Sequence, residues 1–189
     1  MKSIFLKNIQ EHHEVFQNLG ALDERIEIAV EAIIKSLRGR GKILLCGNGG
    51  SAADCQHIAA EFTGRFVKDR PPIAAISLTT DTSALTCISN DYSYVDIFSR
   101  QLNALGRNGD CLIAISTSGN SENVLKAVNE AREIGIFTIG LLGKDGGRLA
   151  SICDLPLIVP SSVTARIQEA HILIGHSICE MVEKDLGLV

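Results

Sequence analysis

Residues 43–51 read ILLCGNGGS, and this stretch decides the class of fold. Its four leading apolar residues form a continuous run between glycines, which is typical of a strand buried on both faces of a parallel sheet. Upstream of Gly41 the apolar residues recur at helical spacings, so the period changes here. A helical run at 51–66 follows the glycine-rich loop. The stretch therefore predicts a strand, a loop and a helix in succession, the unit from which α/β proteins are built.

The same unit recurs downstream. Four further apolar runs are strand candidates: 73–76, 111–115, 136–141 and 155–159. Helical runs separate or follow most of them: 82–89, 94–104, 121–134 and 164–186. Because right-handed crossovers place helices on both faces of such a sheet, the alternation predicts a mostly parallel sheet between two layers of helices.

The residues before this core are helical in pattern. Apolar residues recur at helical spacings in two runs, 4–19 and 22–37. No linker rich in proline or serine and no repeat of constant period divides the chain. We therefore expect one domain over residues 1–189, with N-terminal helices in 1–40 and the α/β core in 41–189.

Composition excludes several classes of protein. With 189 residues and 46% hydrophobic content, the chain can bury a core without disulfides. A net charge of −4 and only 4% aromatic residues argue against nucleic acid as a direct ligand. Six cysteines without a CxxC pair, no secretory signal and no long apolar run predict reduced thiols in a cytoplasmic protein outside the membrane. His12 and His13 are expected to face solvent.

The loop after the third strand candidate is the best candidate for a phosphate site. Four hydroxyls fall within six residues, on Ser116, Thr117, Ser118 and Ser121. Gly119 permits close approach of the backbone, and the free N–H groups of the following helix point at the same place. One hydroxyl would suffice for a helix cap, so four favour a bound phosphate. The loop lacks the GxxxxGK[ST] pattern, so neutral donors would hold it.

Two other loops are less specific. Gly47 to Ser51 matches the dinucleotide-binding fingerprint only loosely, and the acidic residue expected after the second strand is missing, because Asp81 lies too far along. A dinucleotide cofactor is therefore not expected. Asn90 and Asp91 either end the preceding helical run or present an amide and a carboxylate to sugar hydroxyls.

Polar side chains interrupt two apolar helices. His57 and Glu61 are four residues apart and share one helix face, where they form either a surface pair or a metal-binding or basic group. The last helical run carries Gln168, His171 and His176 among apolar residues. Helical periodicity does not decide which histidine belongs with Gln168.

Five segments together resemble the phosphoheptose isomerases of the sugar-isomerase (SIS) domain superfamily: CGNGGSAADCQHIAAEFTGRF, ISNDY, GDCLIAISTSGNSENVLKA, GLLGKDGG and TARIQEAHILIGHSICE. The resemblance covers nearly the whole chain, from about residue 15 to 186. The serine loop alone indicates only the superfamily. HIAAE in one helix, combined with RIQE and a later histidine in the last helix, is more specific.

The resemblance implies both a fold and an activity. The fold is a three-layer α/β sandwich with a central five-stranded parallel sheet and an N-terminal helical extension, assembled as a homotetramer. The activity is the conversion of D-sedoheptulose 7-phosphate to D-glycero-D-manno-heptose 7-phosphate, which leads toward ADP-heptose and lipopolysaccharide or related surface glycans. One zinc ion per active site is implied as cofactor.

Site residues follow from the resemblance position by position. It implies four zinc ligands and favours His176 over His171: His57, Glu61, Gln168 and His176. The substrate-binding positions are Asn48, Gly49, Gly50, Ser51, Glu61, Asn90, Asp91, Ser116, Thr117, Ser118, Ser121 and Gln168. Isomerisation through an enediol needs a base at carbon and an acid at oxygen. We hypothesise that Glu61 moves the carbon proton and that His176 moves protons between the oxygens.

Three alternatives remain. A non-enzymatic relative associates with the bacterial replication initiator as a scaffold, but it resembles a member that has lost the helix acid, which this chain keeps as Glu61. A sugar-phosphate-sensing domain would normally be fused to a DNA-binding module. An isomerase of another phosphosugar would share the same phosphate loop.

Overall fold

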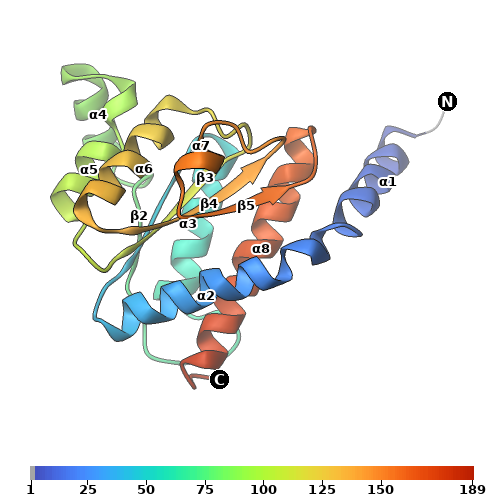
Figure 1. Ribbon diagram of the computed structural model, residues 1–189, viewed down its shortest axis with the longest axis horizontal. Helices are drawn as coiled ribbons and strands as arrows, with labels where there is room; N and C mark the ends of the chain where they lie inside the picture. Colours follow the sequence, from blue (N-terminus) through green and yellow to red (C-terminus); the bar gives the residue numbers. More distant parts are fainter. Residues whose placement is uncertain (1–2) are drawn as a thin grey trace.

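One sheet of five parallel strands organises the molecule (Figure 1). The computed structural model describes residues 3–189. The strands are β1 (Ile43–Gly47), β2 (Ala75–Ser77), β3 (Cys111–Ser116), β4 (Phe137–Gly143) and β5 (Leu155–Val159). Their spatial order is β2-β1-β3-β4-β5, so the chain winds outward to β2 and then returns past β1 to β3. Sheets of this topology open a crevice between the two strands where the winding reverses, here β1 and β3.

The two strands at the crevice are also the most deeply buried. Every residue of β1 and of β3 is buried, which explains their continuous apolar sequences. The register pairs Gly47 with Ile115 at the ends of the two strands. Because the strands are parallel, the loops that follow them leave the same edge of the sheet side by side.

Helices cover both faces of the sheet, as the alternation predicted. One face packs on α2 (Asp23–Arg38), α3 (Gly50–Thr63) and α8 (Thr164–Asp185). The other packs on α5 (Ser99–Leu105), α6 (Glu122–Ile134) and α7 (Leu149–Ile152). The helix α4 (Thr82–Asp91) has no buried residue and packs on the 3₁₀ turn η2 (Tyr94–Asp96). Within residues 3–189, none of the helices has the length and apolar character needed to cross a membrane.

The helices α3 and α8 run side by side in the same direction (Figure 1). Gly50 at the start of α3 lies against Gln168, and Ile58 further along lies against Gly175. A Cβ at Gly175 would collide with the side chain of Ile58. The glycine therefore permits the close approach of the two helices.

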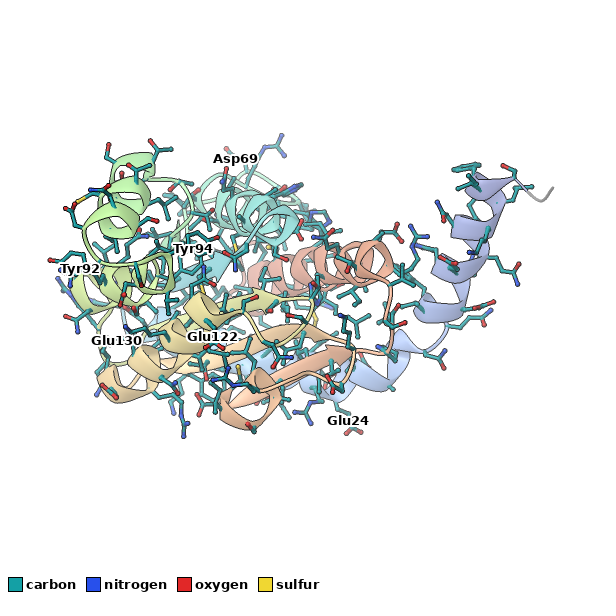
Figure 2. The ribbon with its side chains drawn as sticks, turned by 90° about the horizontal axis from the view of Figure 1, so that it is seen from above. Glu24, Asp69, Tyr92, Tyr94, Glu122 and Glu130 are labelled. Atoms are coloured by element: carbon teal, nitrogen blue, oxygen red, sulfur yellow. The ribbon has the colours of Figure 1, made fainter. Side chains whose placement is uncertain are left out.

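The N-terminal helix α1 (Ile4–Phe16) extends away from the body and joins α2 through the 3₁₀ turn η1 (Leu19–Leu22) (Figures 1 and 2). The expectation that His12 faces solvent is met only in part, because its side chain is 37% exposed. Its Nδ1 lies 2.9 Å from Glu169 Oε2 on α8, and its ring stacks on Phe16. Large apolar side chains on α1 nevertheless remain exposed: Ile4, Phe5, Leu6 and Ile9.

The strand β2 begins two residues later than predicted. The N–H of Ile73 donates to the carbonyl of Phe62 at the end of α3, at 3.0 Å, so it does not join the sheet. Pairing with β1 starts only at Ala75, opposite Ile43. The alanine-rich sequence thus forms a short edge strand.

The helical run predicted at 94–104 is divided into η2 and α5. Ile97 and Phe98 are both buried, at 3% and 1% exposure. Both residues have right-handed helical backbone angles, so the division is a change of hydrogen bonding and not a reversal of the chain. The N–H of Ile97 donates to the carbonyl of Tyr94, as in a 3₁₀ helix, whereas the N–H of Leu102 donates to the carbonyl of Phe98, as in an α-helix. The Ser93 hydroxyl donates to Asp96 Oδ2 at 2.6 Å before this change.

All six cysteines are free thiols, as the sequence predicted. Five of them are buried, and only Cys87 is exposed. Burial, assisted by Asp110 and Asp154, raises the pKa of the Cys111 thiol to about 12. This cysteine therefore packs as a small neutral side chain in the sheet.

Candidate functional site

The serine loop lies at the carboxyl edge of the sheet, beside the β1–β3 crevice. Ser116 ends β3 and is buried, and its Oγ lies 3.0 Å from the Oγ of Ser121. Ser121 is the N-cap residue of α6. Thr117 and Ser118 lie between them and are partly exposed. The hydroxyls and the first turn of α6 therefore come together, where they offer neutral hydrogen-bond donors to an anion.

The backbone of this loop is held against the loop that follows β4. Gly119 adopts φ +65, and a Cβ there would collide with the backbone carbonyl of Gly146. The carbonyl of Gly119 accepts from the N–H of Leu149 at 2.9 Å, and Asn120 Oδ1 accepts from the N–H of Arg148 at 3.1 Å. The shape of the serine loop is thus fixed by close packing that only glycine allows at position 119.

Asn48, in the loop after β1, is held by two residues that the sequence analysis did not select. Its amide exchanges hydrogen bonds with Asn123 of α6, each at 2.8 Å. The hydroxyl of Tyr94 donates to Asn48 Oδ1, also at 2.8 Å. Asn123 is 3% exposed. It lies four residues before Ala127 and eight before Ala131, which are both buried, so an amide among the apolar positions of this helix is the sequence signal that points to it. This network joins the loop after β1 to the start of α6.

A pocket of about 500 Å³ opens beside this network. Gly49, Thr79, Asn90 and Tyr94 are among its lining residues. Asn90 and Asp91 lie at the C-terminal end of α4, as one of the two sequence interpretations expected, and Asn90 Nδ2 donates to Asp91 Oδ1 at 2.8 Å. Asn90 therefore faces the same pocket as the loop after β1.

The first loop meets α8 at Gln168. The Gln168 amide lies so close to Gly50 that a Cβ at this glycine would collide with Nε2. Gly49 adopts φ +58 and precedes the first turn of α3, where Ser51 is buried. Gln168 and the residues of this loop are therefore together at the carboxyl edge.

A second group forms further along the same two helices. His57 Nε2 lies 2.9 Å from Glu61 Oε1 and 3.1 Å from His176 Nε2. Glu61 is one turn after His57 on α3, and the parallel packing of α8 brings His176 opposite both. We call these three side chains the HEH cluster.

The HEH cluster fits a zinc ion. Two imidazole nitrogens and a carboxylate oxygen are zinc donors, and one such atom from each residue lies within 4.8 Å of the others. Asp54, one turn before His57, has a buried Oδ2 without a hydrogen-bond partner among the described residues. Burial raises the pKa of Asp54, and the two histidines oppose that rise. A bound cation would compensate this unpartnered oxygen and the crowded imidazoles.

Gln168 does not lie with the HEH cluster in this chain. It precedes His176 by eight residues, which is about 12 Å along a helix axis. Its amide is at Gly50, and His57 is about two turns further along α3. Three of the four implied ligands thus come together within one chain, and ligation by Gln168 stays a prediction.

His171 lies in the core and not in the site. It is fully buried, and its Nε2 donates to the carbonyl of Leu142 at 2.9 Å. Burial lowers the pKa of this imidazole to about 4, against a weaker opposing effect of the Leu142 carbonyl. The structure therefore places His176, and not His171, beside His57.

Known families match the sequence of this chain. The SIS domain family matches residues 5–143, more than half of the chain. The chain is 56% identical over 181 residues to a phosphoheptose isomerase of Clostridium acetobutylicum, covering 96% of this chain and 92% of that protein. It is 51% identical over 188 residues to a phosphoheptose isomerase of Aliarcobacter butzleri, covering 99% of this chain and 100% of that protein.

Solved structures agree with these matches. Phosphoheptose isomerase from Neisseria gonorrhoeae superposes with a TM-score of 0.91 at 47% identity, over 95% of this chain and 97% of that one. The enzyme from Francisella tularensis gives a TM-score of 0.93 at 37% identity, over 95% and 96%. The five-stranded parallel sheet and its glycine and serine loops define a protein of the SIS domain class. Within that class, the chain belongs to the phosphoheptose isomerase family.

Replacing His171 by glutamine is expected to weaken the acid sensitivity of folding. The pKa of His171 is about 4 in the folded chain and the usual 6.5 in the unfolded chain. Between pH 6.5 and pH 4, His171 is therefore protonated in the unfolded chain but neutral in the folded one. Stability is therefore lost as pH falls from 6.5 toward 4, at up to about 1.4 kcal/mol per pH unit. The variant His171→Gln retains a donor for Leu142 but does not titrate. Urea denaturation between pH 7 and pH 4.5 measures the difference.

The exposed His13 provides the matched control, as His13→Gln. It is expected to follow the pH profile of the unaltered chain. Parallel profiles for the unaltered chain and His171→Gln would contradict the assignment of His171 as a buried neutral imidazole.

Proposed function

We propose that this chain is an isomerase that converts D-sedoheptulose 7-phosphate to D-glycero-D-manno-heptose 7-phosphate. Identity of about 50% over the full length of proteins named phosphoheptose isomerase carries the proposal. The HEH cluster retains the helix acid Glu61, which supports an enzyme over a binding scaffold. The product would serve the synthesis of ADP-heptose for lipopolysaccharide or related surface glycans.

The substrate phosphate binds the serine loop in this proposal. Ser116, Thr117, Ser118 and Ser121 donate hydroxyl hydrogen bonds, and the first turn of α6 supplies N–H groups and the positive end of its dipole. The sugar chain then extends toward the loop after β1, where Asn48 to Ser51, Asn90, Asp91 and Gln168 meet its hydroxyls. Phosphate binding far from the reacting carbons positions them, which lowers the entropic part of the barrier.

Proton transfer between neighbouring carbons is the chemical step. Glu61 takes the proton from the carbon next to the carbonyl and returns it to the former carbonyl carbon. His176 moves a proton between the two oxygens, so the enediol forms without a free charge on oxygen. Each transfer requires a donor and an acceptor within hydrogen-bond reach, which the short contacts of the HEH cluster favour.

We propose zinc as the cofactor, held by His57, Glu61, Gln168 and His176. When bound, zinc supplies electrophilic polarisation of oxygen and holds its ligands in a fixed orientation. The donor chemistry and the unpartnered oxygen of Asp54 support this assignment.

A direct assay tests the function. Purified protein with D-sedoheptulose 7-phosphate should form an aldose phosphate, detected by chromatography with mass spectrometry. Dialysis against a chelator should lower the rate at least tenfold, and added zinc should restore it, because the ion orients the HEH cluster. If no aldose phosphate forms with or without added zinc, the isomerase assignment is wrong and a binding role is favoured.

Replacing Glu61 by glutamine separates catalysis from binding. The variant Glu61→Gln keeps the size of the side chain but removes the base, so kcat should fall by at least about 10³-fold. The sugar phosphate should still bind, as measured by calorimetry, because the serine loop is intact. Turnover retained within tenfold would remove Glu61 from the role of base.

We further propose a homotetramer in which Gln168 reaches the zinc site of a neighbouring protomer. Gln168 lies about 12 Å from His176 along α8, and its amide lies against Gly50 and not at the HEH cluster of its own chain. A second protomer would supply the missing Gln168. The exposed apolar residues of α1 offer a surface for such assembly.

Mixed oligomers test this assembly. Glu61→Gln and Gln168→Ala subunits, each inactive alone, should regain activity when refolded together, since one intact site can form from two different chains. Sedimentation velocity should show a tetramer. Full activity in a monomeric species would contradict a shared site.

A further inference from the structure

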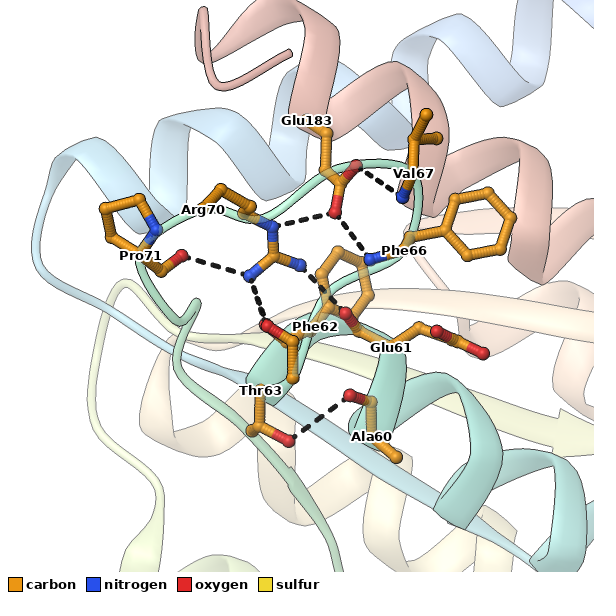
Figure 3. Close-up of polar contacts among 10 residues, drawn as sticks. Ala60, Glu61, Phe62, Thr63, Phe66, Val67, Arg70, Pro71 and Glu183 are labelled. Carbon is orange, nitrogen blue, oxygen red and sulfur yellow. Dashed lines mark hydrogen bonds and ion pairs between the residues drawn. The ribbon is translucent and has the colours of Figure 1, made fainter.

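A buried ion pair lies next to the HEH cluster and is not used by the proposed mechanism. Arg70 Nε donates to Glu183 Oε1 at 2.7 Å, and the two side chains are 1% and 0% exposed (Figure 3). Arg70 lies in the segment after α3, and Glu183 lies on α8, two turns beyond His176. The pair therefore connects the two helices that carry the cluster.

Arg70 closes the C-terminal end of α3. Its Nη2 donates to the carbonyl of Glu61 at 2.8 Å, and its Nη1 donates to the carbonyl of Phe62 at 2.7 Å. Carbonyls in the last turn of a helix lack partners within the helix, so a buried end needs donors from elsewhere. The guanidinium of Arg70 supplies such donors, one of them to the carbonyl of Glu61, whose side chain belongs to the HEH cluster.

Glu183 fixes the start of the segment that follows α3. Its two carboxylate oxygens accept from the N–H groups of Phe66 and Val67, at 2.9 and 3.1 Å (Figure 3). Burial alone would raise the pKa of Glu183, but these two N–H groups and Arg70 hold it below the usual range. The carboxylate is therefore charged at neutral pH and anchors the backbone at Phe66.

The side chain of Phe66 then reaches the HEH cluster. Its ring stacks on the imidazole of His176, with centroids 5.3 Å apart and an angle of 27° between the planes. The edge of the same imidazole faces His57, with 3.1 Å between the Nε2 atoms. One face of His176 is thus supported by Phe66 while its Nε2 points at the other histidine.

We propose that Phe66 is a positioning residue for His176, and that the Arg70–Glu183 pair acts through it by fixing its backbone. The proposal rests on the proposed function of the HEH cluster. An imidazole on a surface helix can rotate about two side-chain bonds, and a stacked ring restricts that rotation. Groups that orient a metal-binding histidine change metal affinity or activity about 10- to 100-fold when they are removed.

Variants at position 66 test the positioning role. Phe66→Leu keeps an apolar side chain but removes the stacking ring, whereas Phe66→Tyr keeps the ring. We expect Phe66→Leu to lower zinc affinity and kcat each about tenfold, with KM for the sugar phosphate within twofold. Phe66→Tyr should retain both within threefold. Zinc affinity is measured by competition with a chelating dye, separately from activity.

Phe137→Leu is the matched control, because Phe137 is also a partly buried aromatic residue but begins β4, at the edge of the sheet away from the predicted site. It is expected to leave zinc affinity and kcat unchanged. The proton resonances of the His176 ring give a readout that needs neither zinc nor activity, since the Phe66 ring current shifts them. They should move in Phe66→Leu and not in Phe137→Leu, even if the proposed function were wrong.

Glu183→Gln tests the contribution of the ion pair. It keeps the shape of the side chain and removes the charge, and it should lower zinc affinity in the same direction as Phe66→Leu. The double variant Phe66→Leu with Glu183→Gln should lose little more than Phe66→Leu alone, because both changes act through one ring. Thermal denaturation shows whether each variant is folded.

Two outcomes would overturn the proposal. Unchanged His176 resonances, zinc affinity and kcat in Phe66→Leu would show that the ring does not position His176. A Glu183→Gln variant that melts at lower temperature but keeps the zinc affinity and the His176 resonances would show that the ion pair is only structural. If the unaltered chain shows no isomerase activity, the proposed function is rejected. The test by the His176 resonances remains valid in that case.

Discussion

The close parallel packing of α3 on α8 is the constraint on which the site depends. Both helices start at the carboxyl edge of the sheet and run in the same direction, so equivalent turns face each other along their length. The first turns bring Gln168 to Gly50, and two turns later His176 faces His57. Interhelical distance is set by side chains at the contact, and Gly175 against Ile58 keeps it short. A wider spacing would separate the two histidines before it disturbed the sheet.

Much of the fold could be predicted from local patterns, and the failures have physical causes. Continuous apolar runs located β1, β3, β4 and β5 to within one or two residues. For the inner strands β1, β3 and β4 the reason is that strands buried on both faces have no polar alternation. The start of β2 was predicted too early, because the N–H of Ile73 donates to Phe62 of α3 and not to the sheet. This is a tertiary contact, which a local pattern does not reveal. The division of the run at 94–104 depended on a change from 3₁₀ to α-helical hydrogen bonding near Ile97, which apolar spacing does not reveal.

The site was predictable where its residues are local and not where they meet across the fold. The i,i+4 pair of His57 and Glu61 and the hydroxyls of 116–121 are visible in the sequence alone. The choice between His171 and His176 was not, since both lie within 80° of Gln168 on a helical wheel and only packing shows which is buried. Tyr94 reaches Asn48 from a separate turn of the chain, so no spacing rule could have selected it.

Three helices begin at the same edge of the sheet, and this placement has an electrostatic consequence. The N-termini of α3, α6 and α8 gather at the carboxyl edge, linked by the contacts of Gly50 with Gln168 and of Asn48 with Asn123. Their partial positive charges add at that edge and decay within a turn. A dianion would be attracted to this edge, where the proposed phosphate site lies. The HEH cluster lies about two turns further along α3, beyond the reach of these partial charges. The proposed anion and metal sites would therefore stand in different electrostatic surroundings.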